Sequence, residues 1–417
     1  MDLQAQIEAK AAAAREAARA LAVLPTSAKN KALLAMANAL VKRQDKILQA
    51  NAQDIEAGRA KKLSRALLDR LLLNEDRVRA MAEGLRQTAA LPDPVGEEIC
   101  GMRRPNGLEI RKVRVPLGVI GIIYEARPNV TADAMGLCLK AGNAVVLRGG
   151  SEAIHSNTAL VSVLSAAAYE AGIPDGAVQF IDVTDRTAVN ILLKLRGFLD
   201  VVIPRGGAGL IRAVVSESAV PVIETGTGVC HTFVDASADL AMARGIALNA
   251  KVSRPAVCNA METLLVHEAV VADFLPEMLE AFRQAGVEVR GCAETLRYDP
   301  NILPASEADW ETEYGDLIVS VKIVPDLDAA VGHIARYGTK HSEAIVTRDY
   351  SSARRFQQCV DAAAVYVNAS TRFTDGFEFG FGGEIGISTQ KLHARGPMGL
   401  PELTSVKYLI SGDGQVR

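Results

Sequence analysis

Short apolar runs alternate with longer amphipathic segments along most of this chain, and no other feature constrains the fold as strongly. The apolar runs cover residues 117–124, 144–147, 177–181, 201–203 and 220–223 in a first series, and 262–266, 317–324, 343–347 and 364–367 in a second. The segments between them have helical spacing, namely 152–171, 208–217, 238–249, 269–285, 326–337 and 351–360. Such alternation is typical of βαβ units and predicts parallel sheets. We therefore expect an α/β fold with two parallel-sheet lobes.

The first 90 residues depart from this alternation, because Ala, Leu, Lys, Glu and Arg dominate and apolar residues recur at helical spacing. This region is predicted to form several helices. Further on, Asn106-Gly107 lies between two strand-like flanks, which predicts a hairpin over residues 97–115. The alternating segment 404–410 resembles another strand. Neither segment has a sheet of its own in the pattern, so we expect them to pair between subunits.

Composition and charge exclude several classes of partner. The chain has 46 basic and 49 acidic residues, so no electrostatic signature points to nucleic acid or to an anionic membrane. The six cysteines show no metal-ligand spacing, and we expect no metal site and a reducing compartment. Charged residues interrupt the N-terminal segment, and no apolar run approaches the roughly 20 residues that a bilayer requires. We therefore expect a soluble, cytoplasmic protein that acts on a small molecule.

Glycine-rich segments follow two of the expected strands. Gly149-Gly150-Ser151 comes after the 144–147 run and Arg205-Gly206-Gly207 after the 201–203 run, each directly before an expected helix. Glycines at such a turn let backbone amides and the helix N-terminus approach a phosphate group. Neither segment matches the G-x-G-x-x-G fingerprint, and either could be an ordinary strand–helix turn. Two such loops, with Arg148 and Arg205 beside them, favour a nucleotide phosphate as the ligand.

Three further side chains are candidates for chemistry, and each has an ordinary structural explanation. Cys258 lies in an apparent loop, where a cysteine can be a nucleophile but is more often a small buried residue. Asn129 stands at an expected helix start, where asparagine commonly caps the helix. Glu224 follows the 220–223 run, where a carboxylate is usually solvated or paired. Residue type and position alone leave these alternatives open.

Taken in order along the chain, these segments match a set of family motifs. They are Pro116-Leu117-Gly118-Val119 for P-x-G-V, Arg127-Pro128-Asn129 for P-W-N, residues 139–152 for A-G-N-x-V-V-x-K-P-S-E, Glu224-Thr225-Gly226 for E-L-G-G, Glu313-Tyr314-Gly315 for E-x-F-G and Phe381-Gly382-Gly383 for F-G-G. Cys258 follows Glu224 at the separation usual in that family. The set resembles the aldehyde dehydrogenase superfamily over nearly the whole chain. This resemblance implies an aldehyde dehydrogenase-like fold with a cofactor lobe, a catalytic lobe and a small β oligomerisation ribbon.

Departures from these motifs narrow the resemblance. The tryptophan of P-W-N is replaced, the glutamine before the cysteine is missing, and Lys-Pro becomes Arg148-Gly149. Together with residues 324–330, Lys340-His341-Ser342-Glu343 and residues 395–400, these changes resemble the branch that reduces acyl phosphates. The resemblance implies NADPH-dependent reduction of L-glutamyl 5-phosphate to L-glutamate 5-semialdehyde and phosphate, in proline biosynthesis. The alternatives are an NADP-dependent dehydrogenase of another aldehyde and a catalytically silent protein on the same fold.

The resemblance also implies a division of labour along the chain. Residues 1–96 and 116–228 would form an NADP-binding domain, residues 229–403 a catalytic domain, and residues 97–115 and 404–417 an oligomerisation ribbon. Cys258 would be the nucleophile that forms a thioester, Asn129 a donor to the oxyanion, and Glu224 a proton shuttle. The implied partners are further copies of the chain in a homo-oligomer and an upstream glutamate kinase.

Charged side chains complete the expected site. The resemblance places Arg148 against the adenosine ribose or its 2′-phosphate, and Glu313 against the nicotinamide ribose. It places Arg372 against the α-carboxylate of the glutamyl group. Arg127 and Arg205 are candidate ligands for the phosphate of substrate or cofactor, because a guanidinium group binds phosphate oxygens bidentately. Either of these two arginines could instead be a solvent-facing charge.

Overall fold

The computed structural model describes residues 2–417, which form two compact units. The first unit contains the chain up to Thr225 together with Gly380–Gly386 and Met398–Arg417, and the second contains Gly226–Phe379 and Ile387–Pro397. Two short segments that we expected in the catalytic domain, 380–386 and 398–403, thus belong to the first unit. The assignment of a cofactor role to the first unit and a catalytic role to the second stays a prediction.

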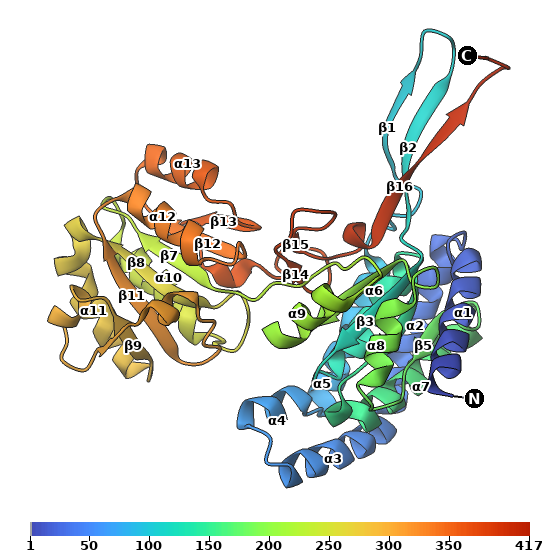
Figure 1. Ribbon diagram of the computed structural model, residues 1–417, viewed down its shortest axis with the longest axis horizontal. Coiled ribbons are helices and arrows are strands. Elements are labelled where there is room, and N and C mark those ends of the chain that lie inside the picture. Colours follow the sequence, from blue (N-terminus) through green and yellow to red (C-terminus); the bar gives the residue numbers. More distant parts are fainter. Residues whose placement is uncertain (1) are drawn as a thin grey trace. The chain divides into compact units, whose positions relative to one another are not determined.

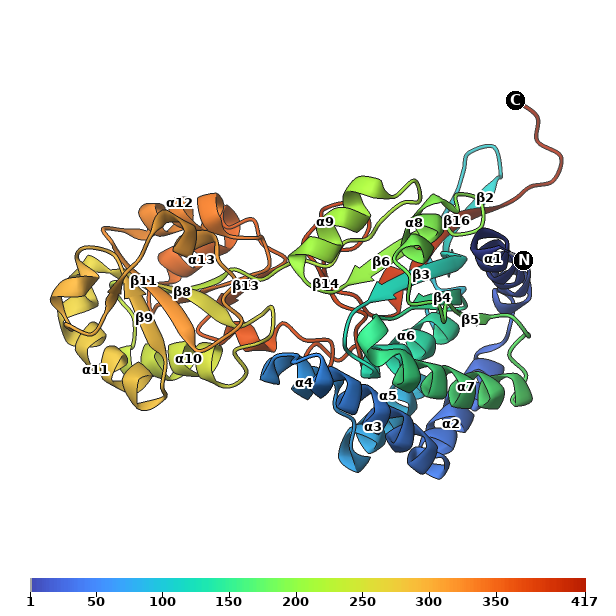
Figure 2. The same ribbon diagram turned by 60° about the horizontal axis from the view of Figure 1, so that its bottom comes forward.

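A four-stranded parallel sheet forms the centre of the first unit, in the order β5-β4-β3-β6. Its strands are β3 (Val119–Tyr124), β4 (Ala144–Arg148), β5 (Val178–Phe180) and β6 (Val201–Arg205). Helices α1 (Leu3–Leu21) and α8 (Thr187–Lys194) pack on one face of this sheet, and α6 (Asn129–Lys140) and α7 (Ile154–Glu170) cover the other (Figure 2). Helix α9 (Ala208–Glu217) follows β6. The parallel sheet predicted for this region is confirmed.

The helical N-terminal region forms α1 and four further helices. These are α2 (Thr26–Lys42), α3 (Gln44–Ala60), α4 (Arg65–Leu71) and α5 (Glu75–Ala90). The side chains of Asp2, Ser64 and Asn74 cap α1, α4 and α5 by accepting backbone N–H groups, which explains where these helices begin. Helix α2 packs against α5 and α7, and α3 packs against α7, so these helices form an outer layer over α6 and α7 (Figure 2).

The hairpin and the C-terminal strand form one antiparallel sheet of three strands. They are β1 (Glu98–Arg103), β2 (Glu109–Pro116) and β16 (Thr404–Ser411), and β2 lies in the middle (Figure 1). The turn between β1 and β2 places Gly107 at a φ of 90°, the left-handed conformation that an Asn-Gly turn requires. The two segments without a sheet in the sequence pattern therefore pair with each other inside one chain. Pairing between subunits stays a prediction.

One expected strand of the first unit is absent, and the second unit contains strands that the sequence pattern did not predict. Residues 220–223 make only an isolated bridge, between Val202 and Val222, because Pro221 has no N–H group to donate to a ladder. In its large sheet, the unpredicted strands are β7 (Cys230–Val234), β9 (Glu288–Gly291) and β10 (Leu303–Pro304). Strand β7 is fully buried, but its sequence Cys-His-Thr-Phe-Val is not an apolar run.

The second unit is built on a seven-stranded parallel sheet in the order β10-β9-β11-β8-β7-β12-β13. Its remaining strands are β8 (Met261–His267), β11 (Ile318–Val324), β12 (Ser342–Val346) and β13 (Ala364–Val367). One apolar core joins the sheet to α10 (Leu240–Val252) and α11 (Val271–Gln284). A second core, on the other face, joins it to α12 (Leu327–Tyr337) and α13 (Tyr350–Cys359). The second parallel sheet is thus confirmed.

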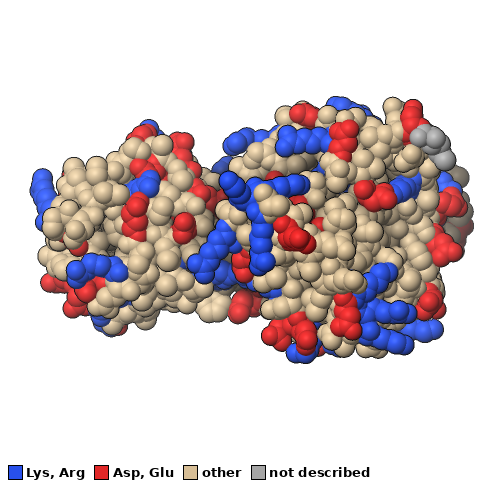
Figure 3. Space-filling view, turned by 90° about the horizontal axis from the view of Figure 1, so that it is seen from below, with Lys and Arg blue, Asp and Glu red and all other residues tan. Residues whose placement is uncertain are grey.

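Short elements complete the two units. Strands β14 (Ile387–Ser388) and β15 (Gly396–Pro397) pair with each other, and short 3-10 helices lie at Ser151–Ala153, Glu268–Val270, Thr295–Arg297, Glu307–Glu311, Thr371–Phe373 and Pro401–Leu403. None of the helices formed by residues 2–417 combines the length and the apolar composition needed to cross a membrane. On the face shown in Figure 3, basic and acidic side chains are interspersed, as the near-balanced charge leads one to expect.

Candidate active site

Cys258 lies in the loop of the second unit that connects α10 to β8. It is partly buried and, with Asn259, forms the centre of a β-turn that the Ala260 N–H closes onto the Val257 carbonyl at 3.0 Å. An added Cβ on Gly228 would lie 1.5 Å from the Cys258 carbonyl oxygen, so only glycine allows this approach of the two backbones. The loop therefore presents a thiol on a turn whose backbone is tightly enclosed.

Arg372 packs against this loop rather than standing apart from it. Its Nε donates to the Ser253 hydroxyl at 3.1 Å, and its Nη1 donates to the Asn259 side-chain oxygen. In return, the Asn259 amide donates to the carbonyl of Thr374 at 2.9 Å, and Thr371 donates its hydroxyl to the Asn259 carbonyl at 2.7 Å. The structure thus brings Arg372 together with the Cys258 loop, while its predicted contact with a substrate carboxylate stays a prediction.

A buried ion pair brackets the same loop. Lys251, near the end of α10, lies 2.6 Å from Glu262, near the start of β8, and both side chains are fully buried. Burial raises the pKa of Glu262 to about 7 against the opposing effect of Lys251, and burial likewise lowers the pKa of Lys251. The other oxygen of Glu262 accepts the Gly315 N–H at 3.4 Å. The pair therefore links the Cys258 loop to the segment that carries Glu313.

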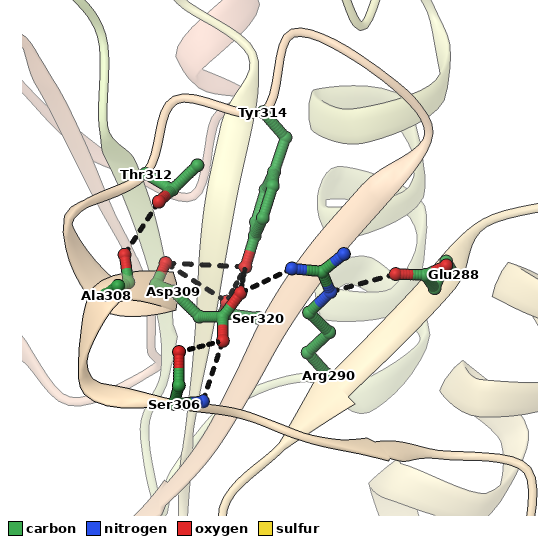
Figure 4. Close-up of polar contacts among 8 residues, drawn as sticks. All are labelled: Glu288, Arg290, Ser306, Ala308, Asp309, Thr312, Tyr314 and Ser320. Carbon is green, nitrogen blue, oxygen red and sulfur yellow. Dashed lines mark hydrogen bonds and ion pairs between the residues drawn. The ribbon is translucent and has the colours of Figure 1, made fainter.

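Tyr314 anchors that segment from the other side. Its hydroxyl donates to Asp309 at 2.9 Å and lies 2.7 Å from the Ser320 hydroxyl, and Arg290 donates to the same Asp309 oxygen at 2.6 Å (Figure 4). Burial raises the pKa of Asp309, but the bonds from Ser306 and Arg290 hold it well below its usual range. The Tyr314 ring also makes cation–π contacts: the Arg290 guanidinium lies 5.2 Å and the Lys251 ammonium 5.9 Å from the ring centre. Glu313 is exposed beside this fixed tyrosine.

In the first unit, the loop after β4 borders a cavity. Arg148 ends β4 with 9% of its surface exposed, its Nη2 donates to the Thr184 carbonyl at 3.2 Å, and its buried Nε has no partner. Gly149 and Gly150 are buried, and Ser151 is exposed at the start of a 3-10 helix. Ser151 and Thr184 line a cavity of about 270 Å³ together with Glu152, Lys61 and His155. Of the predicted cofactor residues, Ser151 therefore lines the cavity, and Arg148 is connected to its wall through Thr184.

The loop after β6 is arranged differently. The Gly207 N–H, at the start of α9, donates to the Glu125 carboxylate at 2.8 Å, and the Arg205 carbonyl accepts the Glu125 N–H at 3.1 Å. Arg205 is partly buried, whereas Gly206 and Gly207 are exposed. An internal carboxylate thus holds the helix N-terminus that we predicted to bind phosphate. An anionic ligand at this loop would have to replace Glu125.

Asn129 is the first residue of α6 and is exposed, while Pro128 holds the cap position without a side-chain bond. Asn129 therefore does not cap its own helix. Its amide donates to Asp133, one turn further along, at 3.3 Å. Burial raises the pKa of Asp133 to about 6, and Asn129 and Arg205 oppose that rise. Asn129 and Arg205 thus both interact with the carboxylate of Asp133.

Arg127 and Glu224 are both partly buried in the first unit. Arg127 lies two residues before α6 begins, within the segment that follows β3. Glu224 follows the isolated bridge at Val222, and the hydroxyl of its neighbour Thr225 donates to the Pro204 carbonyl at 2.8 Å, which fixes the chain at the end of this unit. Their predicted roles in anion binding and proton transfer stay predictions.

Comparison with known proteins identifies the family to which this chain belongs. Residues 2–309 match the aldehyde dehydrogenase family. Over all 417 residues of both proteins, the chain is 64% identical to the gamma-glutamyl phosphate reductase of Moorella thermoacetica. The chain belongs to the gamma-glutamyl phosphate reductase family. A crystal structure from the same family, that of the Thermotoga maritima protein, matches with a TM-score of 0.96 at 51% identity over 99% of each chain.

Membership of the gamma-glutamyl phosphate reductases makes the chain an oxidoreductase and confirms both the family resemblance and the aldehyde dehydrogenase-like fold. Sequence reasoning missed several residues that this fold places around the predicted ones, among them Lys251, Glu262 and Asp133. No local signal marks Lys251 and Glu262, because they form their pair from separate elements, and Asp133 follows Asn129 by one turn on the same helix. In the described residues, 2–417, no group of three metal-ligating side chains is placed to hold a metal ion.

One motif of this chain differs in spacing from the superfamily motif that it resembles. In E-x-F-G one residue separates the glutamate from the aromatic residue, whereas Glu313 directly precedes Tyr314. Thr312 occupies the place of the glutamate, and its hydroxyl donates to the Ala308 carbonyl at 2.6 Å (Figure 4). Contact between Glu313 and the nicotinamide ribose therefore stays a prediction.

Proposed function

We propose that this enzyme reduces L-glutamyl 5-phosphate to L-glutamate 5-semialdehyde with release of phosphate, in proline biosynthesis. The full-length identity to gamma-glutamyl phosphate reductases is the observation that carries the proposal. Direct reduction of a carboxylate by hydride is unfavourable, whereas an acyl phosphate is an activated acyl group. Cys258, partly buried on a turn, suits the role of nucleophile for such a group.

The proposed reaction has two stages at the Cys258 sulfur. The thiolate attacks the acyl carbon, the C–S bond forms, the bond from carbon to the phosphate oxygen breaks, and phosphate leaves with that electron pair. The resulting thioester is reduced, the C–S bond breaks, and the thiolate is regenerated as the aldehyde is released. NADPH, when bound, supplies the hydride. Cysteine fits both stages because it is a strong nucleophile and also a good leaving group.

Other residues are assigned around the acyl group in this proposal. The amide of Asn129 and the backbone N–H of Cys258 would donate to the oxyanion of each tetrahedral stage, where one such donor is worth roughly a hundredfold or more in rate. Arg372 and Arg127 would bind the anionic ends of the substrate. Glu224 would serve as a proton shuttle rather than activate water, because hydrolysis of the thioester would waste the substrate.

The cofactor is assigned to the first unit, where the residues fit a phosphorylated adenosine. The cavity of about 270 Å³ beside Ser151 carries Lys61 on its wall, and the buried Arg148 Nε beside it lacks a partner. Gly149, without a side chain, lets Asn157 approach the backbone there. In this proposal Arg148 and Lys61 bind the 2′-phosphate that distinguishes NADPH from NADH, and the Arg205-Gly206-Gly207 loop accepts another phosphate.

Two partners complete the proposal. The substrate must come from an ATP-dependent kinase that phosphorylates the side-chain carboxylate of glutamate, because an acyl phosphate hydrolyses readily. Further copies of this chain would pair through the sheet of β1, β2 and β16, where Met102, Tyr408 and Ile410 are exposed large apolar side chains.

The test is the reverse reaction, oxidation of glutamate 5-semialdehyde with NADP. We expect this oxidation to require phosphate or arsenate as the acyl acceptor and to disappear in Cys258→Ala and Cys258→Ser. Oxidation that proceeds equally well without either anion would instead indicate an NADP-dependent dehydrogenase of another type. Full activity in both cysteine variants would overturn the thioester.

A further inference from the structure

Cys230 lies directly behind the turn that carries Cys258, and it has no part in the reaction proposed above. It is the first residue of β7 and is fully buried. Its sulfur lies 3.2 Å from the Cys258 carbonyl oxygen, to which its thiol donates. The bare Cα of Gly228, two residues earlier, lies against the same carbonyl group. Gly228 and Cys230 therefore enclose the carbonyl oxygen of the predicted nucleophile, Cys258.

That oxygen belongs to the central peptide of the turn, between Cys258 and Asn259. In a β-turn the peptide between the two central residues takes no part in the closing hydrogen bond, and its rotation interconverts type I and type II turns. Type II requires a positive φ at the second central residue, here Asn259, and asparagine tolerates that conformation. Asn259 is not among the described residues with a positive φ. The turn is therefore not of type II, and the Cys258 carbonyl has the orientation found before such a rotation.

A ring of buried side chains supports the bond from Cys230. His341 Nδ1 lies 3.8 Å from the Cys230 sulfur and 2.8 Å from the Ser342 hydroxyl, and that hydroxyl lies 2.6 Å from the hydroxyl of Thr374. All four side chains are fully buried. The ring closes because the Thr374 carbonyl accepts the amide of Asn259, the residue after Cys258. Hydrogen bonds among buried side chains favour one conformation of the loop that they join.

We propose that Cys230 is a positioning residue that holds the Cys258 carbonyl inward, turned away from the nucleophilic thiol and the Cys258 N–H during acyl transfer. This inference rests on the proposed role of Cys258. A flipped peptide would turn a partly negative oxygen towards the position where the substrate oxyanion develops, and the two would repel. The motif Lys340-His341-Ser342-Glu343 gains a function in this way, since it supplies the ring.

The thiol of Cys230 can act as a donor only while it keeps its proton. Burial raises its pKa well above the ordinary value, and the nearby Glu343, Cys258 and Glu262 raise it further. The backbone N–H of Ser342 is the one opposing group. Cys230 therefore stays a protonated thiol over the pH range in which a nucleophilic cysteine works.

The experiment compares Cys230→Ala with Cys230→Ser, which keeps a donor, and with Cys138→Ala as the matched control. Cys138 is an equally buried cysteine on α6 of the first unit, and burial alone raises its pKa. The first readout is alkylation of Cys258 by iodoacetamide in the whole enzyme without substrate, followed at the Cys258 peptide by mass spectrometry over a pH series. The second is kcat set against the dissociation constant of NADPH.

For Cys230→Ala we expect slower Cys258 alkylation at pH 7, an alkylation profile shifted to higher pH, and a kcat lower by about tenfold with unchanged NADPH affinity. Cys230→Ser should restore most of the Cys258 alkylation and most of kcat. Cys138→Ala should change neither the alkylation nor kcat. A Cys230→Ala enzyme with the wild-type profile and kcat would overturn the inference, as would a Cys230→Ser enzyme as impaired as Cys230→Ala.

If Cys230→Ala does not fold, Thr374→Val breaks the ring at its far side with a side chain of the same shape. The same shift in alkylation is then expected, and its absence would overturn the inference. Alkylation of Cys258 needs no turnover, so this result is separate from the proposed function. That function fails if Cys258→Ser remains active, whatever the Cys230 variants show.

Discussion

The glycine loops of the first unit and the Cys258 loop of the second are held by different means. The loop after β6 exposes Gly206 and Gly207, and the Gly207 N–H donates to the carboxylate of Glu125, which a ligand could replace. The Cys258 loop is held by Cys230, by Arg372 and by the Lys251–Glu262 pair. The loop after β6 thus keeps its backbone accessible to a ligand, whereas the loop that carries the predicted nucleophile is fixed from several sides.

Among the variants that test this difference between the loops, Gly228→Ala is expected to have the largest effect. The new methyl group would lie 1.5 Å from the Cys258 carbonyl oxygen and 2.4 Å from its carbon, so the loop must move. A displacement of about 1 Å near a reacting group can cost about a hundredfold in rate. We expect kcat to fall by at least about that factor, measured with gamma-glutamyl phosphate.

Gly245→Ala is the control for this variant. Gly245 lies in α10 of the same unit, and an added Cβ there meets no atom within 4 Å. Alanine should therefore stabilise the helix by about 0.5–1 kcal/mol and leave kcat unchanged. If Gly228→Ala and Gly245→Ala were equally active, the Cys258 loop would be no more constrained than the loops of the first unit.

The buried pair gives the next largest effect. Glu262→Gln leaves the Lys251 ammonium buried without a counter-charge, so the free energy of unfolding should fall by about 3–5 kcal/mol in urea titrations. The double variant Lys251→Met with Glu262→Met removes both charges and should lie close to the wild type. A matched exposed pair in the same unit, Asp328 with Arg355, should lose less than about 1 kcal/mol when Asp328 becomes Asn. A Glu262→Gln loss no larger than this would show that the buried pair does not fix the loop.

The same contrast explains what the sequence could and could not predict. Strand–helix alternation and glycine turns are local patterns, and so both sheets, the loops after β4 and β6 and the Cys258 loop were predicted correctly in position. Strand β7 was missed because His231 is buried there only through its bond to Glu343, a residue distant in sequence. Residues 220–223 were wrongly expected to form a strand, because the apolar run hides the missing donor of Pro221. The ring behind Cys258 joins four separate segments, and no local pattern marks it.

In the first unit, cofactor choice tests whether the cavity beside the loop after β4 binds a ligand. Arg148→Ala should raise the Michaelis constant for NADPH by about tenfold and that for NADH much less, because a charge-assisted bond to the 2′-phosphate is lost. Lys61→Ala, at the cavity wall, should act in the same direction, and the exposed Lys42→Ala should change neither constant. Equal effects of Arg148→Ala on both cofactors would remove this arginine from the proposed 2′-phosphate site.

The smallest expected effect concerns pH and Asp133. Its pKa is about 6 in the folded protein against an ordinary 3.8, because burial disfavours the charged form. Between these values the folded state keeps a proton that the unfolded state has lost, so this group makes stability fall as pH rises from about 4 to about 6. Asp133→Asn should remove a decrease of about 1–2 kcal/mol over that range, less than the whole shift would give, because the side chain is partly exposed. Urea titrations at several pH values measure it. An unchanged difference between variant and wild type across the range would mean that Asp133 titrates normally, and that the carboxylate beside Asn129 is as accessible as the loops around it.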